Sequence, residues 1–327
     1  MDAKQKKWMP AGIMGSLLCT GLLALPAGSA LGQAFPAARP VTLYVPWTAG
    51  GTTDLALRAL AESTTKPLGQ KILVENKPGV SGAMGATLVA TSRPDGYTLT
   101  QLPLGVFRLP MMSKTAFDPI KDLTWIINIA GYEFATNVRG DAPWKNWDDF
   151  LAYSKANPGK VTYGHPGVGT SPNLVMAALG QRLGIQWVDV PYKGSADTIT
   201  ALRAGQIMAV ASSPPWPFVK SGEVRPLITW GPKRSPKAPD VPTLKERYGI
   251  LANSPWGIGG APGMDPKTTK ILHDAFRKAM DDPALEKALD AVNMELFYMA
   301  GADYMKWVRE TYEEEKKAYE RIEAANK

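Results

Sequence analysis

Apolar and polar positions along this chain form short blocks whose lengths suit strands and helices. Apolar runs long enough for a buried strand occur first at residues 41–45, 71–75 and 97–102. Helical periodicity lies between them, at residues 53–66 and 83–90. Pro67 and Gly69 predict the end of the first of these helices. The order strand–helix–strand–helix–strand predicts a parallel sheet with helices on both faces.

The alternation then starts again further along the chain. Helical segments are predicted at residues 147–156, 172–183 and 196–204. Strands are predicted at residues 161–163, 187–190 and 207–211. From residue 266 the pattern turns helical and ends in a long packing helix near 304–325. The sequence therefore predicts a second α/β unit, followed by a helical segment.

The first 34 residues have a different pattern from the rest of the chain. A basic start with three lysines precedes an apolar stretch at 13–25, and small residues follow up to Ala34. This order is typical of a secretory signal peptide, so we expect cleavage before Phe35. A retained membrane anchor is the alternative, but it needs roughly 20 apolar residues and this run is shorter. Cys19 lies inside the apolar stretch, and we interpret it as one of its apolar residues and not as a lipidated cysteine.

Composition after cleavage narrows the class of protein further. Loss of residues 1–34 removes three lysines and one aspartate, which lowers the formal charge from +7 to about +5. No cysteine remains, so neither a disulfide nor a thiol is expected. The remaining positive charge is scattered and not interleaved with aromatic residues, which argues against nucleic acid as a partner. A mild positive field suits the attraction of small anions.

The motifs of common enzymes are each missing a part. The sequence has two histidines, His165 and His273, and they lie far apart. No Cys/His spacing predicts a zinc site, and no Gly-x-Ser-x-Gly elbow offers a nucleophile. Pro172 stands where a dinucleotide-binding fingerprint would have its third glycine. We therefore expect no catalytic residues, no metal and no cofactor.

Two similar loops remain as the candidate binding site. Each follows a predicted strand and opens a predicted helix, and each carries glycines and hydroxyl side chains. The candidate ligand-binding residues of the first loop are Trp47, Thr48, Ala49, Gly50, Gly51, Thr52, Thr53 and Asp54. Those of the second are His165, Gly167, Val168, Gly169, Thr170 and Ser171. Hydroxyl N-caps, exposed backbone N–H groups and a helix dipole together favour an anion. Ordinary strand-to-helix turns with capping residues are the alternative for either loop alone.

Six segments, the first Gly-rich loop among them, make a family resemblance specific. The chain resembles the tripartite tricarboxylate transporter solute-binding proteins, also called the Bug family, in segments that follow the family's order along nearly the whole chain. These segments are the Pro-x-x-x-Gly-Gly-x-x-Asp loop at 46–54 and residues 68–79, 93–99, 117–123, 190–196 and 234–243.

The resemblance implies a periplasmic Venus-flytrap fold, with two lobes that are each a mostly parallel sheet flanked by helices. We place lobe 1 at residues 35–132 and 255–327, and lobe 2 at residues 133–254. Two crossing strands would join the lobes near 129–136 and 251–258. The resemblance further implies a monomer that holds a small organic carboxylate with both Gly-rich loops. It would hand that ligand to the membrane permease subunits of a secondary transporter.

Three positions depart from the family pattern. A loop expected at 104–110 carries Arg108 in place of a polar Ser/Thr/Asn-rich sequence, and Trp47 stands in the first loop. Ser212 and Ser213 occupy the place where many relatives have an aspartate, and we include Ser212 in the candidate site. The missing aspartate argues against a ligand with an ammonium group. The arginine and the added aromatic residues favour a carboxylate on a bulkier, aromatic body. The alternatives are a solvent-facing Arg108 and a Trp47 that only packs.

Two other functions stay open from sequence alone. An exported α/β hydrolase would share the compartment, although no nucleophile–histidine pair supports it. A sensor subunit would use the same ligand-binding fold to present its closed form to a membrane kinase.

Overall fold

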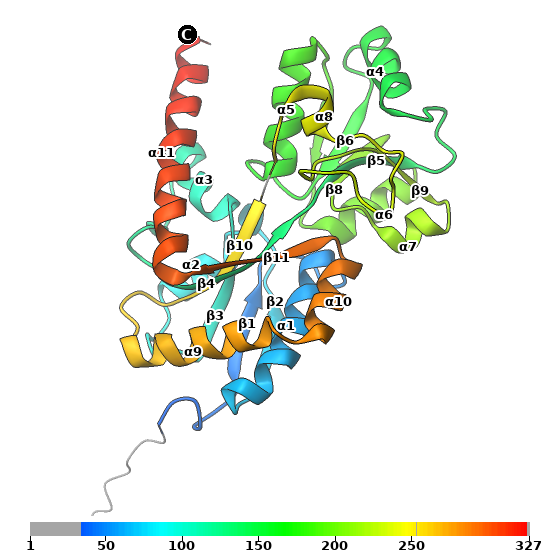
Figure 1. The fold of residues 1–327 in the computed structure, drawn as a ribbon. Coiled ribbons are helices and arrows are strands. Elements are labelled where there is room, and N and C mark those ends of the chain that lie inside the picture. Colours follow the sequence, from blue (N-terminus) through cyan, green and yellow to red (C-terminus); the bar gives the residue numbers. More distant parts are fainter. Residues whose placement is uncertain (1–33, 253, 326–327) are drawn as a thin grey trace, which may run out of the picture. The chain divides into compact units, whose positions relative to one another are not determined.

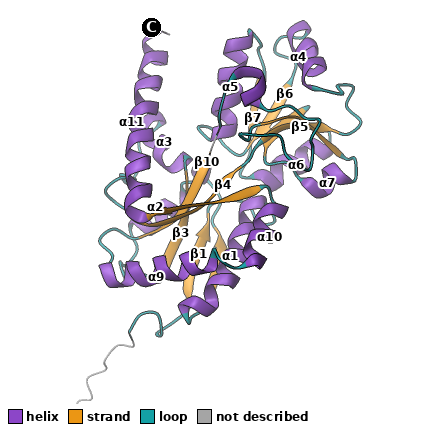
Figure 2. Ribbon diagram, viewed as in Figure 1, coloured by secondary structure: helices purple, strands orange, loops and turns teal. Residues whose placement is uncertain are grey.

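The computed structural model describes residues 34–252 and 254–325. The expected signal peptide therefore lies almost wholly outside the described residues. Two β-sheets with flanking helices organise the described chain (Figures 1 and 2). We call the six-stranded sheet with its helices lobe 1, and the five-stranded sheet with its helices lobe 2.

The sheet of lobe 1 has the strand order β11-β4-β10-β3-β1-β2. Its strands are β1 (Val41–Val45), β2 (Ile72–Asn76), β3 (Thr98–Pro103), β4 (Thr124–Tyr132), β10 (Ser254–Gly260) and β11 (Met294–Ala300). Strand β1 is parallel to both β2 and β3, as the strand–helix alternation predicts. Strands β10 and β11 run antiparallel to their neighbours, so the sheet is mixed.

The sheet of lobe 2 has the strand order β7-β6-β8-β5-β9. Its strands are β5 (Ala135–Arg139), β6 (Thr162–His165), β7 (Val188–Pro191), β8 (Ala209–Ser212) and β9 (Val224–Thr229). Strand β6 is parallel to β7 and β8, whereas β5 is antiparallel to β8 and β9. The chain passes from the first sheet to the second between β4 and β5, and returns through β10.

Helices cover the two sheets separately. Those of lobe 1 are α1 (Thr52–Leu68), the 3-10 turn η1 (Val80–Gly82), α2 (Met84–Ala90), α3 (Gly105–Met112), α9 (Pro266–Ala279), α10 (Pro283–Ala291) and α11 (Gly301–Ala325). Those of lobe 2 are α4 (Trp147–Ala156), α5 (Ser171–Leu183), α6 (Ser195–Arg203), α7 (Trp216–Lys220) and α8 (Leu244–Tyr248). None of the helices in the described part is long and apolar enough to span a membrane.

Two local predictions need correction. The segment expected to be a loop at 104–110 forms helix α3, because Val106, Phe107 and Leu109 are buried in one apolar cluster. The helix predicted at 53–66 extends further, because α1 includes Pro67 and runs to Leu68, whereas its stop at Gly69 agrees with the prediction. Gly69 has a φ of 71°, the left-handed conformation that glycine adopts without strain.

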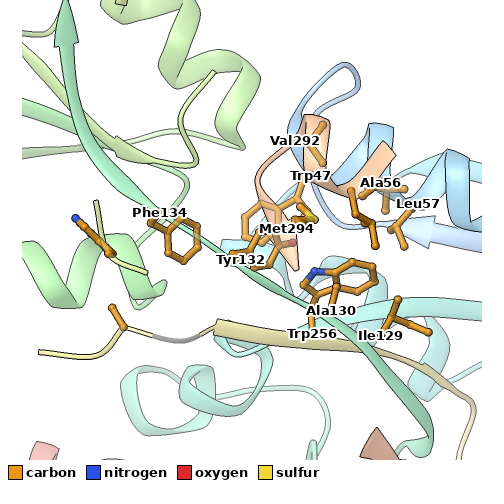
Figure 3. Packing of buried hydrophobic residues seen from close by; sticks show 14 of the residues in the cluster. Trp47, Ala56, Leu57, Ile129, Ala130, Tyr132, Phe134, Trp256, Val292 and Met294 are labelled. Atoms are coloured by element: carbon orange, nitrogen blue, oxygen red, sulfur yellow. The ribbon is translucent and has the colours of Figure 1, made fainter. Parts of the chain in front are cut away.

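The core of lobe 1 reaches the point where the chain crosses between sheets. Tyr132 stacks on Phe134 with ring centroids 5.4 Å apart, and Trp256 of β10 lies 6.3 Å from Tyr132. Figure 3 shows these rings along the crossing strands, with Trp47 close to Tyr132. Aromatic packing therefore stabilises the chain where it crosses between the two sheets.

Candidate functional site

The first Gly-rich loop lies between β1 and α1, and a buried aspartate organises it. Asp54 accepts hydrogen bonds from the Gly50 N–H, from Asn76 and from Arg58, each within 2.9–3.0 Å. Burial by itself would raise the pKa of Asp54, but these hydrogen bonds and the Arg58 charge outweigh it and lower the pKa. Asp54 therefore holds the shape of the loop and does not line a cavity of the site.

A buried polar chain supports Thr53 from beneath. Trp47 Nε1 donates to Gln101 Oε1 at 3.0 Å, and Gln101 Nε2 donates to the Tyr132 hydroxyl at 2.7 Å. The Tyr132 hydroxyl also shares a hydrogen bond of 2.7 Å with Thr53 Oγ1. Burial raises the pKa of Tyr132 well above its usual range, so the hydroxyl keeps its proton. Trp47 thus both packs and positions Thr53 at the first turn of α1.

The second Gly-rich loop lies between β6 and α5. His165 is fully buried beneath it, with Nε2 3.2 Å from Asp189 Oδ2 and Nδ1 2.9 Å from the Gly167 carbonyl. Asn173 Oδ1 accepts from the Gly169 N–H at 3.0 Å. Thr170 Oγ1 donates to the Gly167 carbonyl at 2.6 Å. The loop is fixed by its own side chains.

The predicted hydroxyl caps are not present at either helix. Gly51 is the N-cap of α1 and Thr170 that of α5, and neither makes a side-chain capping bond. The physical reason at α5 is that the Thr170 hydroxyl is already used by Gly167. Uncapped first turns leave backbone N–H groups for an external acceptor, which favours the anion site more than capped helices would.

Both loops meet across the boundary between the lobes. A cavity of about 30 Å³ is bounded by residues of lobe 1, lobe 2 and the crossing strands: Trp47, Thr53, Pro103, Leu104, Gly105, Tyr132, Phe134, Pro166, Thr170, Ser171, Pro172, Ser195 and Ser254. A cavity of this volume has room for about two water molecules. An organic ligand therefore needs the lobes to move apart before it can enter this cavity.

Direct contacts hold the lobes together in this conformation. Thr48 Oγ1 donates to Asp197 Oδ2 of α6 at 2.9 Å. Arg108 Nη1 donates to Ser171 Oγ at 2.9 Å. A β-carbon built on Gly167 would lie 2.8 Å from Ser81 Oγ and 3.0 Å from Ser81 Cα, so the backbone of the second loop touches lobe 1.

The other candidate residues line a second cavity, are exposed on the loops, or are buried. Gly50, Gly51 and Thr52 line a larger cavity that is separate from the small one. Ala49, Gly50 and Val168 are exposed on the loops. Ser212 is fully buried at the end of β8, and Gly169 lies against Met112 of lobe 1.

Arg108 is not solvent-facing, so that alternative is wrong. Its side chain is 11% exposed and forms a bidentate pair with Glu315 of α11, with both N–O distances at 2.5 Å. Its role towards a ligand stays a prediction. Sequence reasoning missed Gln101, Tyr132, Ser195 and Ser254, which stand in or under the cavity. The Gly194-Ser195 start of a helix was the one available signal, since it repeats the glycine–hydroxyl pattern of the two loops.

Comparison with known proteins decides the family. The family described as "Tripartite tricarboxylate transporter family receptor" matches residues 56–324. The chain belongs to this family. A UPF0065 protein in the gbd 5′ region of Cupriavidus necator is 45% identical over 314 residues, which are 95% of each chain. The receptor and solute-binding class predicted from the sequence is thus confirmed.

Solved structures confirm the two-lobed fold. The periplasmic binding protein BugD is 26% identical with a TM-score of 0.82 over 86% of this chain and 97% of its own. MatC of Rhodopseudomonas palustris, solved with malate, is 26% identical with a TM-score of 0.79 over 87% and 100%. R. palustris Rpa4515, solved with adipate, is 27% identical with a TM-score of 0.81 over 86% and 96%.

We expect the stability of this receptor to depend on pH through a buried histidine. Burial lowers the pKa of His165 below its usual value, although Asp189 and Gly167 act in the opposite direction. The unfolded chain therefore binds a proton first as pH falls through about 6.5, and folded stability decreases from there towards the folded-state pKa. We expect the free energy of unfolding to fall between pH 7.5 and 5, and His165→Gln to flatten that fall.

His273→Gln provides the matched control, because His273 is partly exposed on helix α9, beside Asp274. Denaturant titrations at several pH values measure all three proteins. A slope that His165→Gln leaves unchanged would contradict the assignment. Comparing the variants with the wild-type protein also cancels the contribution of Glu133 to the free energy of unfolding. Burial raises the pKa of Glu133, so its contribution changes with pH in the opposite sense to that of His165.

Proposed function

We propose that this chain is a periplasmic receptor that captures a small organic carboxylate between its lobes and delivers it to a tripartite tricarboxylate-type secondary transporter. The observation that carries the proposal is the meeting of uncapped helix starts from both lobes at one boundary. Each start offers backbone N–H groups and a positive dipole end to an anion. The dicarboxylates bound by MatC and Rpa4515 support a carboxylate as the ligand.

The proposal includes export and the lobe boundaries. The basic, apolar and small-residue order of residues 1–34 supports a cleavable signal peptide, and the family's periplasmic members support the compartment. The two passages between sheets support lobe 1 at residues 35–132 and 255–327, and lobe 2 at 133–254. We further propose that the receptor works as a monomer and without a cofactor.

The geometry around His165 supports binding without catalysis. A hydrolytic triad needs a hydroxyl nucleophile on one imidazole nitrogen and a carboxylate on the other. Asp189 is near Nε2, but Nδ1 faces the backbone of Gly167. No hydroxyl side chain in the described range hydrogen-bonds to His165, which supports a receptor over a hydrolase.

Thermal stability with candidate ligands tests the proposal. Adipate and malate, each compared with its diamide, separate recognition of the carboxylate from recognition of the body. A carboxylate at ~100 times Kd should add ~2.7 kcal/mol to the free energy of unfolding, and the diamides should add almost nothing. If a broad set of carboxylates, aromatic ones included, left the stability unchanged, the proposal would fail.

Closure of the lobes is a separate expected result. Thr48 and Asp197, and Arg108 and Ser171, hold the lobes together in this conformation, so the ligand-free protein should populate an open form that lets a ligand enter. A ligand that touches both lobes then favours the closed form. We expect solution scattering to show a smaller radius of gyration with saturating ligand. An identical value with and without ligand would contradict this motion.

A further inference from the structure

A second, larger cavity lies beside the small one and joins the two lobes. Its volume is about 370 Å³, within the range of small-molecule sites. Lobe 1 contributes the start of α1 and the end of α10, and lobe 2 contributes the start of α6 and the segment 213–218. We call this cavity the large chamber.

One end of the large chamber is built for an anion. Helix α1 begins there after Gly51, and helix α6 begins there after Gly194, in both cases without a side-chain cap. Ser213 also lines the chamber and is 1% exposed, yet its hydroxyl has no hydrogen-bond partner among the described residues. Thr52 also lines the chamber, and its hydroxyl is likewise buried without a partner among the described residues. Buried hydroxyls without partners are costly, which points to an acceptor that comes from a ligand.

Much of the remaining lining of the large chamber is apolar. Leu55, Ile199, Trp216, Phe218 and Val292 line it together with three prolines. Among the described residues that line it, the one cation is Arg203. Its guanidinium already donates to Glu223 Oε2 at 2.9 and 2.6 Å, and it stands over the Phe218 ring at 4.0 Å. A second carboxylate on the ligand would therefore meet apolar walls and a cation that is already paired.

We propose that the ligand of the large chamber is a monocarboxylate with a compact apolar ring as its body. The carboxylate lies at the starts of α1 and α6 near Ser213, and the ring packs between Leu55, Trp216 and Phe218. This inference rests on the proposed function and specifies its ligand class. It places the ligand beside the cavity of about 30 Å³, with the start of α6 in the part that the proposed function gives to the start of α5. It differs from the open-chain dicarboxylates of MatC and Rpa4515, and the paired state of Arg203 is the reason.

Calorimetric titration with benzoate, cyclohexanecarboxylate and adipate tests the ligand class. We expect both ring acids to bind at least about tenfold more tightly than adipate, because burying a second carboxylate without a partner is unfavourable. Tighter binding of adipate would overturn the inference and leave the proposed function standing. Binding of none of the three, nor of malate, would overturn both.

Two variants test the location. Leu55 is half exposed and is the fourth residue of α1, so Leu55→Gln should fold normally and weaken benzoate binding roughly threefold or more. Leu174→Gln is the matched control, since Leu174 is the fourth residue of α5, is also partly exposed and does not line the chamber. Equal affinities for benzoate in the two variants would place the ligand elsewhere.

Ser213→Ala gives a signature that a structural role would not produce. Removing a buried hydroxyl that lacks a partner should raise the melting temperature of the ligand-free protein. The same change should weaken benzoate binding about tenfold, because the carboxylate loses a donor. An unchanged affinity for benzoate would overturn the role given to Ser213 and the anion end of the chamber with it.

Discussion

Gly167→Ala is expected to weaken ligand binding by about tenfold to hundredfold. The added β-carbon would lie 2.8–3.1 Å from three atoms of Ser81, and one of these is the Ser81 Cα, which cannot rotate away. Ser81 belongs to lobe 1 and Gly167 to lobe 2, so the collision arises when the lobes close. Overpacking of this kind costs about 1–3 kcal/mol, and the cost falls on the closed, ligand-bound form. Calorimetric titration measures the change in Kd.

A control is needed because Gly167 has a φ of 142°, where any side chain is strained. Gly184 at the end of α5 also has a positive φ, 64°, but a β-carbon there meets nothing within 4 Å. Gly184→Ala should therefore lower folding stability and leave affinity unchanged. Adding Ser81→Gly to Gly167→Ala should restore part of the affinity, since two of the three close atoms disappear. Wild-type affinity in Gly167→Ala would show that the bound form is not closed at this point.

Strand and helix positions could be predicted from sequence because each is encoded locally. The strands of both parallel units lie within two residues of their predicted bounds, and helix α4 matches at both ends. Periodic burial fixes such elements without knowledge of the partner. Helix α3 was missed for the opposite reason. Pro110 in its last turn disfavours a helix, and the burial of Phe107 against Trp125 decides the conformation through a distant contact.

The two loops were recognisable, but the partners of their side chains were not. Glycine–hydroxyl patterns mark the starts of α1 and α5 in the sequence itself. Nothing local connects Trp47 to Gln101, or Thr48 to Asp197, which is 149 residues away. No local pattern singles out Ser213, because the missing partner of its hydroxyl depends on the chamber that tertiary contacts form around it. Local sequence patterns thus predict which helix starts offer backbone N–H groups to an anion. The class of ligand depends on side chains that only tertiary contacts bring together.

Arg108→Ala is expected to weaken ligand binding by about 1.5–3 kcal/mol, the usual contribution of a hydrogen bond to a charged group. In the closed form Arg108 reaches from α3 to Ser171 at the start of α5, and Ser171 Oγ in turn donates to Ser254 Oγ at 3.2 Å. The arginine therefore links lobe 1 to lobe 2 and to the crossing strand β10. Ser171→Ala should lose part of the same affinity, and the double variant should lose less than the sum.

A variant of Glu315 distinguishes an Arg108 that links the lobes from an Arg108 that binds the ligand directly. Its bidentate pair with Arg108 orients the guanidinium and balances its charge, and its side chain is 30% exposed. If Arg108 only links the lobes, Glu315→Gln should lower folding stability by about 1–3 kcal/mol. This is less than the loss of a fully buried ion pair would cost. The variant should then not tighten ligand binding. If Arg108 reads a ligand carboxylate, the same variant frees the cation and should tighten binding of adipate. Titration of Glu315→Gln, with Lys306→Gln as a control on the exposed face of α11, measures the sign. The structure favours the link, because Arg108 already has a carboxylate partner and does not line either cavity at the lobe boundary.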